Sequence, residues 1–510
     1  MAKRAATRKG REAGARLISC PPGPDQDLTL PPLLDRHQPL HFIGVGGIGM
    51  SALAGILAER GYAVSGSDPR DHAVLDRLRR LGVRVFLEQS ATTVAAIRSG
   101  TSVSPLVVIS SAVPETNPEL AEARRMGLAI CHRSDVLAAL INSQPSIAVA
   151  GSHGKTTTSS LIATLLAATN HDPTAVIGGI VPAFGSNGRH GKGPLLVAEA
   201  DESDGSLVKF KPSLAVLTNV ELDHTDHYPN LEALITTLQR FAGKAERLLA
   251  NRDCPTLRDQ FQPSHWWSIE SPEGVSFAAI AREQRGDGTL ADFYEDGEVV
   301  GSFELPLVGR HNLSNAVAAM AACRLEGVSF AELAQAMAAL QTPGRRFDFR
   351  GIWEGRLVVD DYAHHPSEVA ATLAMARLMV NSGRSPLPLP PRRLVAVFQP
   401  HRYSRTAQFL DGFAAALVEA DSVLIAPLYA AGEAPIQGIN SAAIATALLQ
   451  LDPGKPVLVA ANLEELAAQV VIASREGDLV LAMGAGDVNG LWDQLCQRPP
   501  AAGSDAPLAA

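Results

Sequence analysis

The stretch 41-HFIGVGGIGMSALAG-55 joins a short apolar run, a glycine-rich turn and a second apolar run at helical spacing. A strand that enters a helix through glycines is the first unit of a doubly wound α/β fold. Gly44, Gly46 and Gly49 form the pattern G-x-G-x-x-G, which lets a diphosphate approach the backbone at a helix N-terminus. NAD carries such a diphosphate, but so do other nucleotides, and this stretch alone does not choose between them.

Strands and helices alternate along the rest of the chain. Apolar runs such as 62–68, 106–113 and 214–219 end in polar or glycine residues, and helical stretches such as 231–242 separate them. This alternation predicts parallel, doubly wound sheets, and 510 residues are too many for one compact core. We therefore predict three consecutive α/β domains, a Rossmann-like N-terminal domain at 38–145, a P-loop-type ATPase domain at 146–342 and a Rossmann-like C-terminal domain at 343–496, with a disordered basic extension at 1–37 and a disordered tail at 497–510.

The composition argues against several classes of function. The net charge of −9 disfavours bulk nucleic-acid binding, which needs a basic face. The cysteines are scattered without a C-x-x-C pair, so neither a disulfide framework nor a cysteine zinc site is expected. No apolar run is long enough to span a bilayer, and the basic N-terminus lacks the apolar segment of a secretory signal. These features predict a cytoplasmic protein without membrane insertion.

A second glycine-rich turn, 151-GSHGKTTT-158, follows the apolar run 147-IAVA-150 and precedes a helical stretch. Backbone N–H groups at a helix N-terminus and the Lys155 ammonium suit the β- and γ-phosphates of ATP. Thr156 or Thr157 offers a hydroxyl to Mg²⁺. The spacing G-x-x-G-K-T is two residues tighter than the usual P-loop, but a lysine and three threonines after glycine at a strand-to-helix turn still predict an ATP site.

Acidic and histidine side chains follow two later strands. Oxygen ligands suit Mg²⁺, and one imidazole is compatible with it. Ligands collect at the carboxyl ends of the strands in such sheets, so both clusters are candidates for the metal that accompanies ATP. The clusters are Glu199, Asp201, Glu202 and Asp204 after the first strand, and Asp223, His224, Asp226 and His227 after the second.

Several short motifs occur in a characteristic order between residues 41 and 487. They are GVGGIGMSALA at 44–54, GSHGKTTT at 151–158, EADESD at 199–204, TNVELDHTDHY at 218–228, GRHNLSNA at 309–316, GRRFD at 344–348, DDYAHHPSE at 360–368, HRYSR at 401–405 and GAGD at 484–487. Together they resemble the Mur ligases, the ATP-dependent amino-acid ligases of peptidoglycan precursor synthesis. Ser152, where the family often has threonine, and the variant GRHNLSNA are small departures from the family pattern.

The resemblance implies a reaction and its substrates. Three α/β domains would bind the UDP-sugar, ATP and the amino acid in turn. ATP, together with Mg²⁺, would drive the joining of L-alanine to the carboxylate of UDP-N-acetylmuramate through an acyl phosphate, with release of ADP and phosphate. No nucleic acid would take part, and the chain would act as a monomer or a weak homodimer.

The resemblance also implies roles for individual residues. The catalytic residues would be Lys155, Glu199, His224, Arg346, Asp361 and His364. The ATP-binding residues would be Gly151, Ser152, His153, Gly154, Lys155, Thr156, Thr157, His311, Asn312 and Asn315. The UDP-sugar would be bound by Gly44, Val45, Gly46, Gly47, Ile48, Gly49, Met50, Ser51, Asp68 and Ser111. L-Alanine would be bound by Tyr362, His364, Arg402 and Arg405, and the metal by Thr156, Glu199 and His224.

Two expectations for the alanine site come from the residues themselves. Arg402 and Arg405 lie three positions apart, so on one helical turn both would face the carboxylate of alanine. His364 has an ordinary pKa of about 6.5, which suits a group that helps to remove a proton from the alanine amine.

Three alternative functions are open at this point. An NAD-dependent oxidoreductase would explain the first glycine turn, but neither GSHGKTTT nor the acidic clusters. A non-enzymatic ATP-binding switch would not require HRYSR or DDYAHHP. A related ligase with another acceptor, such as the one that recycles the murein tripeptide, shares the motifs of the first two domains, whereas HRYSR favours a single small amino acid.

The second glycine turn decides how the first is interpreted. Asp68 stands where a dinucleotide fold places a ribose-binding acid, so it does not distinguish NAD from a UDP-sugar. If residues 151–158 bind the ATP that the reaction consumes, the first glycine turn is needed to bind a substrate. We therefore predict that residues 44–51 hold a uridine diphosphate.

Overall fold

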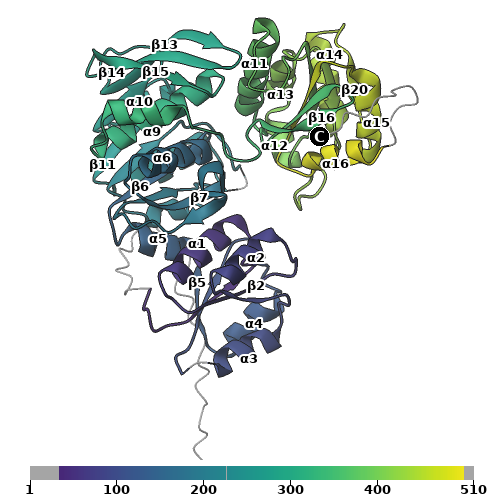
Figure 1. Cartoon of the computed structure of the whole chain (residues 1–510). Coiled ribbons are helices and arrows are strands. Elements are labelled where there is room, and N and C mark those ends of the chain that lie inside the picture. The colour runs from purple at the N-terminus through teal and green to yellow at the C-terminus, as the bar shows by residue number, and fades with distance from the viewer. Residues whose placement is uncertain (1–33, 101, 226, 499–510) are drawn as a thin grey trace, which may run out of the picture.

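The computed structural model describes residues 34–498, apart from 101 and 226 (Figure 1). In this part of the chain the strands form three sheets that follow one another in sequence, and helices pack on each of them. The predicted class, three α/β domains in series, is confirmed. The predicted extension up to residue 33, the tail from residue 499 and Asp226 lie outside the described residues. Among the described helices, none is long and apolar enough to cross a membrane.

The first sheet is parallel, with the strand order β3-β2-β1-β4-β5. The strand order reverses between β1 and β4, and the first glycine turn leaves β1 at this switch point, where such sheets bind ligands. The strands are β1 (Leu40–Ile43), β2 (Val64–Ser67), β3 (Arg84–Phe86), β4 (Leu106–Ile109) and β5 (Ala129–His132). The helices are α1 (Ile48–Glu59), α2 (Ala73–Arg80), α3 (Ala91–Ser99), α4 (Pro118–Arg125) and α5 (Arg133–Ile141).

The central sheet has a parallel middle and antiparallel ends, in the order β15-β14-β13-β12-β11-β10-β6-β9-β7-β8. Its fully buried strand β6 leads into the second glycine turn. The strands are β6 (Ser146–Ala150), β7 (Thr174–Val181), β8 (Ser186–Arg189), β9 (Leu196–Glu199), β10 (Leu214–Leu217), β11 (Arg247–Asn251), β12 (His265–Ser268), β13 (Phe277–Arg285), β14 (Gly288–Glu295) and β15 (Glu298–Leu305). The helices are α6 (Lys155–Ala168), α7 (Leu231–Ala242), α8 (Pro255–Gln260), α9 (Arg310–Leu325) and α10 (Phe330–Met337).

The third sheet has the order β16-β17-β21-β18-β19-β20, parallel except for the edge strand β16. The strands are β16 (Asp348–Trp353), β17 (Arg356–Asp361), β18 (Arg393–Phe398), β19 (Ser422–Ile425), β20 (Val457–Val459) and β21 (Asp478–Met483). The helices are α11 (Pro366–Ser382), α12 (Tyr403–Gln408), α13 (Leu410–Leu417), α14 (Ser441–Leu451), α15 (Leu463–Ala473) and α16 (Leu491–Cys496).

A tight turn at 341–347 connects the central domain to the third. Arg345 and Phe347 have φ values of +59° and +53°, in the left-handed region that side chains disfavour. Thr342 Oγ1 donates to the Arg346 carbonyl at 2.8 Å, and Tyr362 N donates to the Arg345 carbonyl at 2.9 Å. These bonds fix the connection against the end of β17.

The hairpin β7–β8, at the edge of the central sheet, packs on α1 of the first domain. The amide of Asn187 donates to the Ile48 carbonyl at the start of α1, and Arg77 donates to the Gly188 carbonyl at 2.7 Å. A Cβ atom at Gly188 would lie 2.7 Å from the Cα of Ala52, so only glycine fits there. The first glycine turn is thus held in part by a strand of the next domain.

Candidate active site

A cavity of about 390 Å³ lies where the central and third domains meet. The second glycine turn, the start of α9, the connection after residue 341 and the start of α11 line it. Residues that line it include His153, Gly154, Asn312, Asn315, Arg346 and Glu368. The motifs GSHGKTTT, GRHNLSNA, GRRFD and DDYAHHPSE therefore meet at one place.

The second glycine turn presents a charged lysine at the start of a helix. Gly151 and Gly154 have φ values of +124° and +79°, which favour glycine, and α6 begins at Lys155. Lys155 Nζ donates to Glu202 Oε1 at 2.9 Å and to the Gly151 carbonyl at 2.7 Å. Burial lowers the pKa of Lys155, but the carboxylates of Glu202 and Asp201 outweigh it and raise the pKa above its ordinary value. The ammonium stays charged where the helix N-terminus also attracts anions.

Thr156 and Glu199, both predicted metal ligands, lie together. Thr156 Oγ1 donates to Glu199 Oε1 at 3.0 Å, and Gly178 N donates to Glu199 Oε2 at 2.8 Å. Burial is the main reason that the pKa of Glu199 is raised. A cation beside this carboxylate would offset the cost of burying its charge.

His224, the third predicted metal ligand, belongs to a different group of side chains. Its Nε2 lies 3.5 Å from Glu202 Oε1, and ligand atoms of His224, Glu202 and Asp201 lie within 4.8 Å of one another. Glu202 Oε2 is buried and has no hydrogen-bond partner among the described residues. An orphaned carboxylate oxygen beside an imidazole fits a divalent cation. The donor set therefore suits Mg²⁺, and Glu202, a member of the predicted acidic cluster, adds a ligand to the set that the resemblance implies.

Three of the predicted ATP-binding residues, His311, Asn312 and Asn315, lie in the first turns of α9 and line the same cavity. Asn312 Nδ2 donates to a backbone carbonyl at 2.8 Å, and Asn315 Oδ1 accepts a bond from Thr158 at 3.2 Å. No described side chain caps α9, so the helix start does not explain these asparagines. Burial lowers the pKa of His311 to about 4, so its ring is neutral at pH 7.

The first glycine turn faces Asp68. Gly46 N donates to Asp68 Oδ2 at 3.1 Å, and Gly44 has a φ of +80°. Ser111, which follows the neighbouring strand β4, has its hydroxyl 3.2 Å from His132 Nε2. A cavity of about 340 Å³ runs from this turn to the acidic cluster, and its lining includes Gly47, Ile48, Gly49, Arg133, Glu199 and Asp201. Four of the predicted UDP-sugar residues, Gly47, Ile48, Gly49 and Met50, therefore share one cavity with Glu199, whereas Gly44, Gly46, Asp68 and Ser111 do not line it.

Not every predicted UDP-sugar residue offers a side chain to this cavity. Val45 is buried in the core, and the hydroxyl of Ser51 donates to the Ile48 carbonyl at 3.0 Å. Both residues shape the turn through their packing and backbone.

The predicted arginine pair of the third domain does not share a helical turn. Helix α12 begins at Tyr403, and Arg402 precedes it with a φ of +68°. The predicted shared turn is wrong, because Arg402 lies just before the helix with a left-handed backbone and Arg405 lies within it. Arg402 Nη1 lies 3.8 Å from Glu433 Oε1, whereas Arg405 is buried and donates to Asp223 of the central domain.

Tyr362, His364 and Asp361 lie at the end of β17, as their sequence positions suggest. The guanidinium of Arg346 lies 5.2 Å from the centre of the Tyr362 ring. Asp361 accepts backbone bonds from Phe347 at 2.7 Å and Ala363 at 2.8 Å, and burial raises its pKa to about 6. Asp361 therefore holds the domain connection.

His364 does not have the pKa expected for it. Burial lowers its pKa to about 4. Its Nδ1 donates to the Tyr362 carbonyl at 2.9 Å, which leaves the lone pair on Nε2. A group with this pKa is a weak proton acceptor at pH 7, so the sequence-based match is wrong in its physical basis.

Three family models match the chain in the same order as its three sheets. The model described as "Mur ligase family, catalytic domain" matches residues 39–145, "Mur ligase middle domain" matches 149–323, and "Mur ligase, glutamate ligase domain" matches 345–486. The chain belongs to the Mur ligase family. The resemblance stated from the motifs is thereby confirmed.

Individual members of the Mur ligase family are similar over nearly the whole chain. A UDP-N-acetylmuramate–L-alanine ligase of Synechococcus sp. (strain CC9605) is 64% identical over 467 residues, which cover 91% of this chain and 100% of that protein. The enzyme of the same name from Prochlorococcus marinus (strain MIT 9303) is 62% identical, with 94% and 98% of the two chains covered. The crystal structure of UDP-N-acetylmuramate-alanine ligase from Thermotoga maritima has a TM-score of 0.74 at 27% identity and covers 90% and 99%.

In this Mur ligase, one further carboxylate joins several of the predicted residues. Glu368 Oε1 lies 3.3 Å from His153 Nδ1 and 3.8 Å from Arg346 Nη1, and Glu368 Oε2 lies 3.2 Å from His364 Nδ1. Its place near the start of α11 suggests a helix cap, and its Oε2 does accept backbone bonds from His364 and His365. The capping pattern gave no sign that the other carboxylate oxygen faces the second glycine turn.

Proposed function

We propose that this chain joins L-alanine to the carboxylate of UDP-N-acetylmuramate in peptidoglycan biosynthesis. ATP is consumed, and UDP-N-acetylmuramoyl-L-alanine, ADP and phosphate are formed. One observation carries this assignment: the chain is 64% identical to a UDP-N-acetylmuramate–L-alanine ligase along the full length of that relative.

The reaction needs activation because a carboxylate is a poor electrophile. Transfer of the γ-phosphoryl group of ATP makes an acyl phosphate, which the amine of alanine attacks with loss of phosphate. The first step brings two anions together, so catalysis rests on positioning and on neutralising charge. Lys155, held charged by Glu202 at the start of α6, supplies a cation where the phosphates would lie.

Thr156 and Glu199 would hold one Mg²⁺ ion, and His224 with Glu202 would hold a second. When bound, Mg²⁺ neutralises the charge of the phosphates and of the acyl carboxylate. The orphaned Glu202 Oε2 and the buried Glu199 carboxylate support this assignment. Gly178 N orients the Glu199 carboxylate, because it donates to Oε2 while Oε1 faces the Thr156 hydroxyl.

The third domain would supply the alanine site. Arg405 offers a guanidinium for the alanine carboxylate, and Arg402 directly precedes the short helix that holds Arg405. His364, with its lone pair on Nε2, would accept a hydrogen bond from the alanine amine and orient it for attack. Arg346, stacked on Tyr362 at the cavity, would contact phosphate.

The cavity where the central and third domains meet would also serve the chemistry, because an acyl phosphate must be kept from water. We place the reaction in the cytoplasm, where ATP is available, and propose that the chain acts as a monomer or a weak homodimer.

Phosphate release tests the function. The full chain with ATP and Mg²⁺ should release phosphate only when UDP-N-acetylmuramate and L-alanine are both present. Glycine, serine and the murein tripeptide serve as competing acceptors under the same conditions. Release that depends on the tripeptide and not on alanine would replace the proposal with the recycling activity, and release without any acceptor would refute a ligase.

A further inference from the structure

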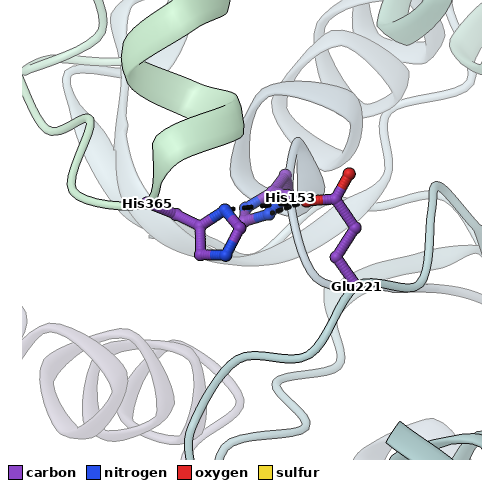
Figure 2. Close-up of side chains that lie close together, drawn as sticks. All are labelled: His153, Glu221 and His365. Atoms are coloured by element: carbon purple, nitrogen blue, oxygen red, sulfur yellow. Dashed lines mark hydrogen bonds and ion pairs between the residues drawn. The ribbon is translucent and has the colours of Figure 1, made fainter. Parts of the chain in front are cut away.

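Three side chains from two domains meet beside the second glycine turn (Figure 2). His153 belongs to that turn, Glu221 follows β10, and His365 directly precedes α11. Glu221 Oε2 lies 3.2 Å from His153 Nε2 and 3.6 Å from His365 Nδ1. The two imidazole rings face each other, with centroids 4.7 Å apart. None of these residues belongs to the proposed Mg²⁺ ligands.

The lone pair of His365 Nδ1 lies beside both a backbone N–H group and a carboxylate. His365 caps α11, so its Nδ1 accepts a bond from Ser367 N at 3.4 Å. The same atom is the one that faces Glu221, and the hydrogen bond from His153 holds the pKa of Glu221 at about 2. His365 Nε2 is buried without a partner among the described residues. Two electron-rich atoms at this separation are stabilised by a cation between them.

His153 has the surroundings of a metal-bound histidine. Its Nδ1 lies 3.3 Å from Glu368 Oε1, as the outer nitrogen of a ligand imidazole typically pairs with a carboxylate. Its Nε2 faces Glu221. A tetrahedral ion with bonds of about 2.0–2.1 Å needs ligand atoms roughly 3.3 Å apart. The separations of 3.2 Å and 3.6 Å lie on either side of that value, and the ligand atoms all lie within 4.8 Å of one another.

We propose that His153, Glu221 and His365 form a binding site for a borderline divalent cation of the Zn²⁺ class. Two imidazoles and one carboxylate favour Zn²⁺ or Co²⁺ over Mg²⁺, which prefers oxygen ligands. The carboxylates of Glu221 and Glu368 balance the charge of the ion, and binding releases the proton of His153 Nε2 to solvent. The fourth position is left for water or a ligand in the cavity, which His153 and Glu221 also line.

An ion at this site ties the second glycine turn of the central domain to the first residue before α11 of the third. It therefore restrains the movement of the two domains relative to each other. Because substrate entry and product release require that movement, Zn²⁺ binding should slow turnover. The effect on turnover is the only part of this proposal that depends on the proposed ligase activity.

Titration calorimetry with ZnCl₂ on the full chain, in excess Mg²⁺, tests the site. Replacing Cys20 and Cys496 by serine in all samples removes thiols that would bind Zn²⁺ independently. We expect one ion per chain and at least about a tenfold loss of affinity in His365→Asn, in which asparagine still caps α11. Glu221→Gln should weaken binding in the same way. His37→Asn, which removes an exposed histidine, should bind Zn²⁺ like the parent.

Co²⁺ provides a second readout that does not depend on activity. A tetrahedral site gives intense visible absorption bands, which should appear in the parent and be absent in His365→Asn. Zn²⁺ should also raise the thermal midpoint of the parent and leave that of His365→Asn unchanged. A Zn²⁺ affinity of His365→Asn within about twofold of the parent would overturn the proposal. So would loss of binding in His224→Asn alone, because the ion would then lie with Asp201 and Glu202.

Discussion

Arg405 and Asp223 form an ion pair in the interior, although 182 positions of sequence separate them and they belong to different domains. Their side chains are only 7% and 5% exposed. Burial raises the pKa of Asp223, but Arg405 outweighs burial and holds it well below the ordinary range. The proposed clamp for the alanine carboxylate is thus already paired with a carboxylate of the chain.

Asp223→Asn should destabilise the protein and make its stability sensitive to alanine. Removing one partner of a buried ion pair costs about 3–5 kcal/mol, because the other charge is left unpaired. The thermal midpoint should fall, and L-alanine should raise it more in the variant than in the parent, since its carboxylate takes the free guanidinium. Asp259→Asn, which breaks an exposed pair with Arg258, should cost no more than about 1 kcal/mol. Equal shifts by alanine in parent and variant would show that Arg405 does not bind it.

Lys155→Met should abolish most of the phosphate release. The ammonium would place a positive charge against the phosphates, and removing a comparable charge-stabilising group lowers kcat by about 10²–10³. Steady-state phosphate release at saturating substrates measures the loss. Lys192→Met, at an exposed site, is the matched control. Turnover within about tenfold of the parent would contradict the role of Lys155.

Gly46→Ala should weaken UDP-N-acetylmuramate and spare ATP. A Cβ at position 46 would lie 2.6 Å from His72 Nε2 and 2.7 Å from Asp68 Oδ2, so Asp68 must leave its bond to Gly46 N. Overpacking of this kind costs about 1–3 kcal/mol, which corresponds to a rise of about 5- to 150-fold in KM for the UDP-sugar. The KM for ATP should stay unchanged. Gly100→Ala, where the new Cβ meets only ordinary contacts, is the control.

The protein should lose stability as the pH falls through the range set by His364. The unfolded chain protonates this histidine near pH 6.5 and the folded chain near pH 4, so the unfolded state gains protons first. Stability is therefore full above about pH 6.5 and declines toward pH 4, by roughly 3 kcal/mol from this group. Thermal midpoints between about pH 7.5 and 5 should fall less in His364→Gln than in the parent. His37→Gln is the control and should behave like the parent. If the thermal midpoint of His364→Gln falls with pH as steeply as that of the parent, other groups cause the pH effect.

Local patterns were sufficient for the elements that carry the glycine turns. The predicted helix at 231–242 is α7 over the same residues, and the apolar runs at 106–113 and 214–219 contain β4 and β10. These succeed because buried parallel strands are continuous apolar runs with glycine or polar residues at their ends. The antiparallel strands β13–β15 were missed, since a sequence such as FAAIAREQR changes from apolar to charged residues within one strand, which gives neither a continuous apolar run nor an alternating pattern.

Pairings between domains lay beyond what the sequence indicated. The helical-turn argument for Arg402 and Arg405 assumed a helix that includes Arg402, whereas α12 begins one residue later, at Tyr403. Nothing local to Glu221 indicates that it contacts His153 and Ser367, because those contacts depend on how two domains are placed. The pKa of His364 likewise follows from burial at the junction, which its sequence neighbours do not reveal.

The hairpin β7–β8 limits how freely this chain can be recombined. Its Asn187 and Gly188 contact the start of α1 and Arg77, so the surface that shapes the first glycine turn is encoded on both sides of residue 145. A chimaera that exchanges residues 38–145 for a foreign nucleotide-sugar module would keep a hairpin without its matching helix. Grafting a new donor specificity onto this scaffold therefore requires moving residues 174–189 together with the first domain.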